Sequence, residues 1–196
     1  MYLPSRIGVT VSLIGSKIEP FELRGFHEGS FVDVSSEDFA GEWSIMFFYP
    51  ADFTFVCPTE LEDLADNYSE FQSLNTEIYA VSTDTHETHL AWHGSSTAVG
   101  RVEFPMLSDP TGKVSAAFDV LIEEVWRSDR ATFIIDPDGV IQVVELSADG
   151  IGRNATELLR KLRAAQHVRE NPDQVCPAKW VKVKRHSAGR RLSWQI

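Results

Sequence analysis

The chain has 196 residues, of which 43% are hydrophobic and 24% charged, so it is long enough for one domain with an ordinary buried core. This composition excludes the disordered and membrane classes. The net charge of -11 argues against a nucleic-acid binder, because contacts to phosphates need a basic surface. Two cysteines outside any Cys-x-x-Cys pair are too few for a disulfide-built secreted scaffold. Residues 1–15 lack a convincing signal peptide, so we expect a cytoplasmic protein.

In chain order, residues 12–40 alternate short apolar runs with turns, which predicts a hairpin at the edge of a sheet. The apolar run at 45–49 predicts a buried strand that ends at Pro50. Apolar residues then recur at helical spacing over 58–73. The later pattern predicts strands at 78–82, 104–107, 132–136 and 140–146 and helices at 86–95, 113–118 and 154–168. In the helix at 86–95, we expect Leu90 and Trp92 to face inward. This order predicts an α/β fold with a central mixed sheet and helices on both faces.

Cys57 lies between the predicted strand and the predicted helix. Pro58 suits a first helical turn, and the unpaired amides of that turn favour a thiolate at Cys57. Thr54 offers a hydroxyl three residues earlier. Most lone cysteines are inert core residues. Here the helix-end position, together with the spacing of Pro50 and Thr54, indicates a nucleophile instead.

The stretch from Pro50 through Thr54 to Cys57 resembles the Pro-x-x-x-Thr-x-x-Cys motif of peroxiredoxins, and most of all the bacterial alkyl hydroperoxide reductase C branch. Agreement in the family's order and spacing extends over about residues 12–180 and includes the segments 82–86, 109–112, 130–137, 150–153 and 175–180. The resemblance implies a thioredoxin-like (peroxiredoxin) fold. It also implies a cysteine peroxidase that uses no cofactor and no metal and acts on hydrogen peroxide and organic hydroperoxides in antioxidant defence and redox homeostasis.

The same resemblance assigns catalytic roles to Cys57, Thr54, Pro50 and Arg130, with Cys57 as the peroxidatic cysteine and Arg130 as the cation beside it. Glu60 and Arg153 match a supporting charge network. Taken alone, both arginines would be ordinary ion-paired residues, and Glu60 would be explained by the helix dipole.

The cation beside Cys57 has a neighbouring alternative, Arg127, which the sequence alone leaves open. The segment 125–127 stands where the family usually has a glycine and small residues ahead of Arg130, and the bulk of Trp126 bears on access to Cys57.

Cys176 is the only other thiol, and the resemblance implies that it resolves the oxidised Cys57 of the partner subunit as an intersubunit disulfide. A dithiol donor must then restore both thiols; in similar proteins this is a flavoprotein disulfide reductase or thioredoxin. The resemblance further implies a head-to-tail homodimer that assembles into a decamer. The alternative interpretations of Cys176 are an unreactive tail thiol and a permanent intrachain bridge, and a reducing cytosol argues against the bridge.

We therefore divide the chain into a disordered N-terminal extension (1–11), a thioredoxin-like peroxidase domain (12–168), and a C-terminal arm with the resolving cysteine and a basic tail (169–196). The rival functions are a chaperone-like holdase ring and a thiol–disulfide oxidoreductase, and the lack of Cys-x-x-Cys argues against the second. His86, His89 and His93 have near metal-ligand spacing, but we expect surface or interface histidines rather than a metal site. We expect no nucleic-acid or membrane partner.

Overall fold

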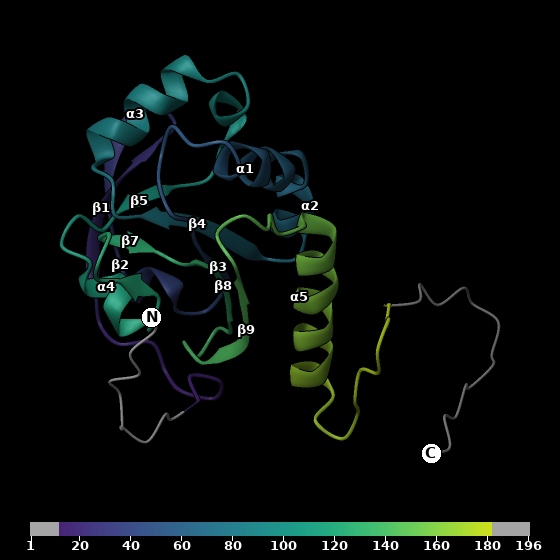
Figure 1. Cartoon of the computed structure of the whole chain (residues 1–196). Coiled ribbons are helices and arrows are strands. Elements are labelled where there is room, and N and C mark those ends of the chain that lie inside the picture. The colour runs from purple at the N-terminus through teal and green to yellow at the C-terminus, as the bar shows by residue number, and fades with distance from the viewer. Residues whose placement is uncertain (1–11, 182–196) are drawn as a thin grey trace.

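The structure is a computed structural model that describes residues 12–181 (Figure 1). The predicted N-terminal extension (1–11) and most of the predicted basic tail (182–196) lie outside the described residues. No helix within 12–181 is both long enough and apolar enough to cross a membrane.

The centre of the molecule is a seven-stranded mixed sheet with the strand order β2-β1-β5-β4-β3-β8-β9. Its strands are β1 (Glu22–His27), β2 (Ser30–Ser35), β3 (Trp43–Phe48), β4 (Thr76–Ser82), β5 (Met106–Ser108), β8 (Arg130–Ile135) and β9 (Ile141–Ser147). A separate two-stranded hairpin consists of β6 (Leu121–Ile122) and β7 (Arg127–Ser128). The β1–β2 hairpin lies at one edge of the sheet, as the sequence predicted.

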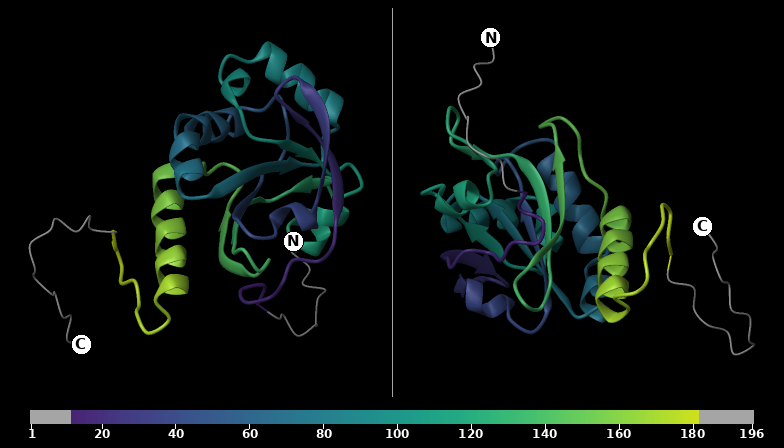
Figure 2. Two further views of the ribbon diagram at one scale, coloured as in Figure 1. Left: turned by 180° about the vertical axis from the view of Figure 1, so that it is seen from behind. Right: turned by 90° about the horizontal axis from the view of Figure 1, so that it is seen from below.

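Helices cover both faces of the sheet, which confirms the predicted fold class (Figure 2). They are α1 (Cys57–Asp66), α2 (Tyr68–Ser73), α3 (His86–Ser95), α4 (Lys113–Ala117) and α5 (Ala155–Glu170), with short 3-10 turns η1 (Ser36–Phe39) and η2 (Val99–Arg101). Side chains of β3 point alternately to the two faces. Ile45 and Phe47 pack with α1, α2, α3 and α5, whereas Met46 and Phe48 pack with η1 and α4.

Two details of the predicted helices were wrong. The helix expected over 58–73 is interrupted at Asn67, whose side-chain amide donates to the backbone oxygen of Asp63 (2.7 Å) and so competes with helical pairing. In α3, Leu90 is 42% exposed, although it was expected to face inward. Trp92 is buried as expected, and His89 takes the other inward position.

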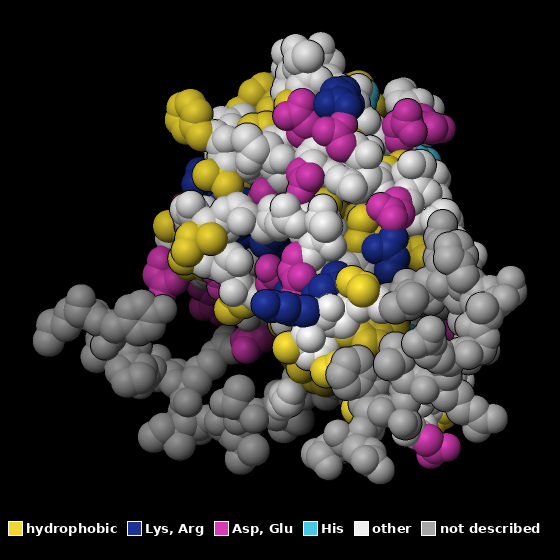
Figure 3. All heavy atoms as spheres, turned by 90° about the vertical axis from the view of Figure 1, so that its right-hand side faces the viewer, with side chains coloured by type: hydrophobic (Ala, Val, Ile, Leu, Met, Phe, Trp, Pro, Cys, Tyr) yellow, Lys and Arg dark blue, Asp and Glu magenta, His cyan; other side chains and the backbone are white. Residues whose placement is uncertain are grey.

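The ion pairs on the α5 side of the molecule tie this helix to its neighbours (Figure 3). Lys161 bonds to Glu145 of β9 (2.8 Å), and Arg163 pairs with Glu70 of α2. Such partly exposed pairs contribute little free energy each. The docking of α5 therefore rests mainly on its buried face, which includes Leu158, Leu159 and Leu162.

The strand directions bring three chain segments together at the end of the sheet where β3 has its carboxyl terminus. β3 runs parallel to β4, and the loop to Cys57 leaves the carboxyl end of β3. β8 runs antiparallel to β3 with Ala131 opposite Phe48, so Arg130 starts its strand beside that loop. Arg130 is in turn opposite Ser147, the last residue of β9. The segment from β9 to α5 therefore begins at the same end of the sheet.

Candidate active site

Cys57 is the first residue of α1 and is 1% exposed. The helix start has no side-chain cap and holds Pro58 in its first turn, as the sequence predicted. The loop before it begins at buried Pro50 and passes through Phe53, whose backbone is left-handed (φ 55°). The hydroxyl of Thr54 donates to the carbonyl of Ala51 (2.9 Å) within this loop. Donation from Thr54 to any other acceptor therefore requires rotation of this hydroxyl.

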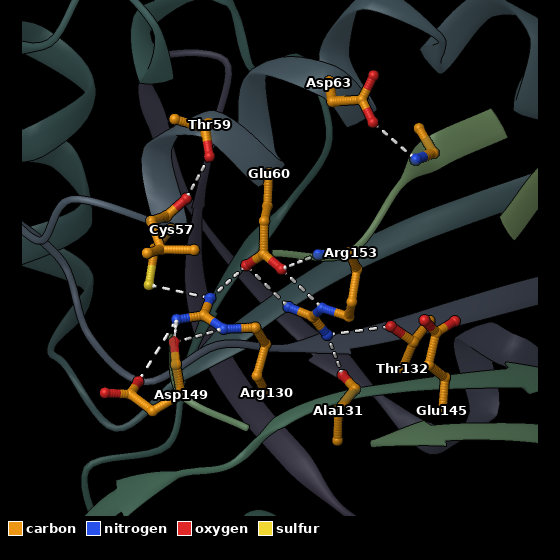
Figure 4. A network of polar contacts seen from close by, with 12 residues as sticks. Cys57, Thr59, Glu60, Asp63, Arg130, Ala131, Thr132, Glu145, Asp149 and Arg153 are labelled. Atoms are coloured by element: carbon orange, nitrogen blue, oxygen red, sulfur yellow. Dashed lines mark hydrogen bonds and ion pairs between the residues drawn. The ribbon is translucent and has the colours of Figure 1, made fainter. Parts of the chain in front are cut away.

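Arg130 is the cation beside the sulfur (Figure 4). Its Nη1 donates to Cys57 Sγ at 3.6 Å and to the carboxylate of Glu60. On the opposite side, Nε and Nη2 donate to the backbone carbonyl of Asp149 at 3.1 and 2.6 Å. The guanidinium is therefore hydrogen-bonded on one side to α1 and on the other side to the segment between β9 and α5. Arg127, the alternative, is exposed on β7.

Glu60 also binds Arg153, which lies just before α5 (Figure 4). Its Oε1 accepts from the backbone N–H of Arg153 (2.7 Å) and from Arg153 Nε (2.9 Å). Arg153 Nη1 donates to the carbonyl of Ala131 (2.6 Å), and its guanidinium stacks 3.4 Å over the ring of Phe47. Glu60 therefore joins the two arginines that the family resemblance paired with it.

The side chains of Arg130, Arg153 and Glu60 are each at most 3% exposed, so water does little to screen their charges. Two guanidiniums and one carboxylate leave one positive charge in excess. The carboxylate of Asp149 lies 3.4 Å from Arg130 Nη2 but is 84% exposed, so it compensates only weakly. A thiolate at Cys57 would neutralise the cluster, and buried charge is far less costly when it is paired.

Both arginines keep their charge in this environment. Burial opposes the charge of Arg130, but its hydrogen bond to Cys57 and the nearby Glu60 carboxylate outweigh burial and raise its pKa. Burial lowers the pKa of Arg153, and contacts with Glu60 offset this in part. An arginine pKa starts so far above neutrality that both groups remain cations. The excess positive charge beside Cys57 therefore persists at neutral pH.

Cys176 lies on the arm that follows α5, and it is a free thiol, as is Cys57. Its S–H donates to the carbonyl of Ala164 on α5 (3.7 Å). Burial raises the pKa of this thiol, and Arg160 opposes the shift in part. Nearby, the ring of Trp180 packs on His167 with centroids 4.8 Å apart. The arm is thus folded back against α5, with Cys176 in its neutral form.

The structure also holds a buried polar group that the sequence interpretation missed. His89 was expected at a surface or interface, yet it is fully buried. Its Nδ1 lies 2.8 Å from Asp52 Oδ2, and its Nε2 lies 3.2 Å from the carbonyl of Leu107. Tyr49 donates to the other oxygen of Asp52 (2.7 Å). These contacts hold the loop that leads to Cys57 in place. The sequence could not predict them, because they join residues that are far apart in the chain.

Burial raises the pKa of Tyr49, and the charge of Asp52 adds to the shift, so the phenol stays protonated and donates.

Within residues 12–181, no group of three or more histidine, cysteine or acidic side chains is arranged to hold a metal ion. The three histidines with near metal-ligand spacing belong instead to separate contacts: His86 faces Glu87, His89 faces Asp52, and His93 faces the carbonyl of Val102.

Trp126 occupies the turn between β6 and β7 with a left-handed backbone (φ 53°). Glycine adopts this conformation most readily. The indole N–H donates to the carbonyl of Pro110 (3.0 Å), and Thr83 donates to the carbonyl of Trp126 (2.8 Å). These bonds hold a tryptophan at a position that favours glycine. They attach the turn to the segments that follow β4 and β5.

The chain was compared with known proteins. A profile of the AhpC/TSA family matches residues 14–144. Alkyl hydroperoxide reductase C of Escherichia coli K12 is 54% identical over 170 residues, which cover 87% of this chain and 91% of that protein.

Solved structures agree. Enterococcus faecalis AhpC superposes with a TM-score of 0.83 at 49% identity, over 85% of this chain and all of that one. The reduced 2-Cys peroxiredoxin of Plasmodium vivax gives a TM-score of 0.84 at 34% identity, over 89% and 92% of the two chains. The motif at Cys57, the fold and these similarities together show that the chain belongs to the AhpC/TSA family of peroxiredoxins.

Proposed function

We propose that Cys57 is the peroxidatic nucleophile of this peroxidase, which reduces hydrogen peroxide and organic hydroperoxides. The observation that supports this most is the buried cluster with one excess positive charge, whose Arg130 Nη1 lies 3.6 Å from Cys57 Sγ. Such a cation stabilises the thiolate and also the negative charge that develops on a peroxide during attack. The burial of Cys57 limits access of bulk water to the reacting atoms.

In the first step the Cys57 thiolate attacks one peroxide oxygen and the O–O bond breaks. The sulfur is oxidised to sulfenic acid, and the other oxygen leaves as water or an alcohol after it takes up a proton. Arg130 stays in place as a hydrogen-bond donor. Thr54 and Pro50 shape the loop around the sulfur, and Glu60 and Arg153 orient Arg130.

In the second step the partner subunit's Cys176 attacks the sulfenic sulfur, forms an intersubunit disulfide and releases water. In this proposal residues 12–168 form the peroxidase domain, and the arm over 169–196 supplies the resolving thiol. The contact of Cys176 with Ala164 must break first, because the docked thiol is neutral and engaged with α5. Two electrons and two protons from a dithiol donor, a flavoprotein disulfide reductase or thioredoxin, then restore both thiols.

We further propose that the protein forms homodimers that assemble into decamers through the loop before Cys57. Phe53 and Phe55, two residues apart in this loop, are 59% and 96% exposed, and exposed apolar surface often marks an interaction site. A cytoplasmic location fits the cycle, because the reducing poise there reopens the disulfide.

A non-reducing gel tests the cycle. The reduced wild type, Cys57→Ser and Cys176→Ser would each receive one equivalent of hydrogen peroxide. We expect a covalent dimer in the wild type only. A wild-type monomer that still consumes peroxide would contradict the role of Cys176, whereas a wild type that consumes none would contradict the role of Cys57. A holdase function would survive Cys57→Ser, so suppression of aggregation by that variant separates the rival activity from peroxidase chemistry.

A further inference from the structure

Two carboxylates on one side of α1 bind successive parts of the segment that leads into α5. Glu60 accepts from the backbone N–H of Arg153 at 2.7 Å. Asp63, three residues further along α1, accepts with Oδ2 from the backbone N–H of Ala155, also at 2.7 Å (Figure 4). Residues three apart on a helix lie on the same side, so the spacing fits this double grip. The segment 153–155 is therefore held along the helix that begins at Cys57.

The carboxylate of Asp63 is itself oriented from its other side. Asn67 Nδ2 lies 3.4 Å from Asp63 Oδ1 and donates to the backbone carbonyl of Asp63 at 2.7 Å. Asn67 is also the residue at which α1 ends and α2 begins. The break in the helix thus helps to direct Asp63 toward Ala155.

Asp63 is not needed as the ordinary cap of α5. The local cap is Asn154, whose side chain accepts from the backbone N–H of Glu157 at 3.0 Å. Asp63 reaches Ala155 from another helix, 92 positions away in the chain. A negative charge near a helix N-terminus is favourable, but this one also fixes where α5 starts relative to Cys57.

The position at which α5 starts matters because the segment 149–153 precedes it. One end of that segment binds Arg130 directly, and the other end binds Glu60, the partner of Arg130. The carbonyl of Asp149 accepts from Arg130 Nε and Nη2. At the other end, Arg153 neutralises the Glu60 carboxylate that also binds Arg130. If 153–155 moved away, Glu60 would lose a cationic partner and would compensate more of the charge of Arg130. The positive field at Cys57 would then weaken.

We propose that Asp63 is a positioning residue of the peroxidase: by holding the N–H of Ala155, it keeps Arg153 on Glu60 and thereby keeps Arg130 available to Cys57. Asp63 does not touch the reacting atoms, and its role rests on the function proposed above for Cys57. The same contact joins the helix that starts at Cys57 to the helix on which Cys176 is docked.

The test compares Asp63→Ala, Asp63→Asn and Asp66→Ala, all in the Cys176→Ser chain so that only Cys57 reacts. The first readout is the pH at which half of Cys57 is alkylated by iodoacetamide, followed by mass spectrometry. The second readout is the rate constant for hydrogen peroxide. Asp66 is the matched control, because it lies on the same helix but is half exposed and pairs with Arg101.

For Asp63→Ala we expect the alkylation midpoint to rise by about one pH unit and the neutral-pH peroxide rate to fall by up to about tenfold, because the thiolate fraction sets both. Asp63→Asn retains an oxygen that accepts from Ala155, so it should remain close to the parent. Asp66→Ala should leave both readouts unchanged.

A lower melting temperature of Asp63→Ala with an unchanged midpoint would overturn the proposal, because it would mean that Asp63 only stabilises the fold. Should Asp63→Ala fail to fold, Asp63→Glu replaces it. The longer side chain must displace segment 153–155, so an intermediate rise of the midpoint is expected and no rise would overturn the proposal. If the parent protein consumes no peroxide, the proposed function fails by itself, and the alkylation midpoint still decides the role of Asp63.

Discussion

At the scale of single residues, the site depends on a small set of buried charges whose balance includes Cys57. Arg130 and Arg153 share the carboxylate of Glu60, and all three side chains are almost fully buried. Removal of one partner from such a group costs much more than removal of an exposed ion pair, because the remaining charge has no water around it. The same group therefore bears on both stability and reactivity, and each can be measured separately.

Glu60→Gln removes the only carboxylate that binds both arginines in this buried cluster. We expect the free energy of unfolding to fall by about 3–5 kcal/mol, because two buried guanidiniums lose their shared counter-charge. Urea unfolding of the reduced protein measures this. Glu62→Gln on the same helix is the control: Glu62 is 42% exposed and pairs with Arg101, so its loss should cost under about 1 kcal/mol. Equal costs for the two variants would contradict the shared-carboxylate interpretation.

Arg130→Lys keeps the positive charge but cannot contact Cys57, Glu60 and the carbonyl of Asp149 together, since an ammonium lacks the planar set of donors. We expect the rate constant for hydrogen peroxide to fall about 100-fold, the scale of losing one donor to a developing negative charge. Stopped-flow kinetics at saturating reductant measures it. Arg127→Lys, on exposed β7, should react like the wild type. A large loss of rate in Arg127→Lys, with little loss in Arg130→Lys, would instead show that Arg127 is the cation that acts on Cys57.

At the scale of elements, the C-terminal arm is held on α5 by a few contacts that can open. Cys176 bonds to the carbonyl of Ala164, His167 Nε2 lies 2.9 Å from the side-chain oxygen of Gln174, and Trp180 packs on His167. All of these contacts lie at a partly exposed surface. The arm is therefore suited to docking in the reduced protein and to leaving α5 at the step of the proposed cycle in which Cys176 reaches another subunit.

Docking of the arm should weaken at alkaline pH. Burial raises the pKa of Cys176 in the docked arm, so docking favours the neutral thiol. This stabilisation is complete below the ordinary thiol pKa of about 8.5 and is lost as the pH rises through the higher value of the docked state. We expect tryptic cleavage after Lys179 to accelerate with pH more in the reduced wild type than in Cys176→Ser. Identical pH profiles would show that the thiol does not contribute to docking.

At the scale of the whole molecule, the loop before Cys57 connects the active site to the proposed assembly. It contains exposed Phe53 and Phe55 and also buried Asp52, which contacts His89. The left-handed backbone at Phe53 and the buried contacts of Asp52 give the loop a defined shape. Association through this loop would therefore stabilise the conformation that surrounds Cys57.

Phe55→Asp tests the assembly. We expect sedimentation velocity to show dimers in place of decamers, because a carboxylate buried in an apolar interface without a partner costs several kcal/mol. Ile14→Asp is the control, since Ile14 is a 56% exposed apolar side chain outside the loop. If Phe55→Asp still assembles to the wild-type size, the loop does not form the interface.

The sequence by itself was enough to predict the fold class, the order of the main elements and the position of Cys57 at a helix start. These features follow from local properties: apolar periodicity, the proline after Cys57, and the spacing of Pro50, Thr54 and Cys57. Family resemblance added Arg130, Arg153 and Glu60 as expectations. The break at Asn67 and the outward side chain of Leu90 were missed, because local periodicity does not include side-chain competition or contacts from other elements.

Only the tertiary structure decided which groups meet. Arg130 is 73 positions from Cys57 in the chain, and it reaches the sulfur because β8 runs antiparallel to β3 and starts beside the loop. β9 ends opposite Arg130, and this places the carbonyl of Asp149 beside the Arg130 guanidinium. Asp63 likewise finds Ala155 through the packing of α1 on α5. Sequence spacing cannot encode these contacts one by one, because they depend on strand order, strand direction and helix packing together.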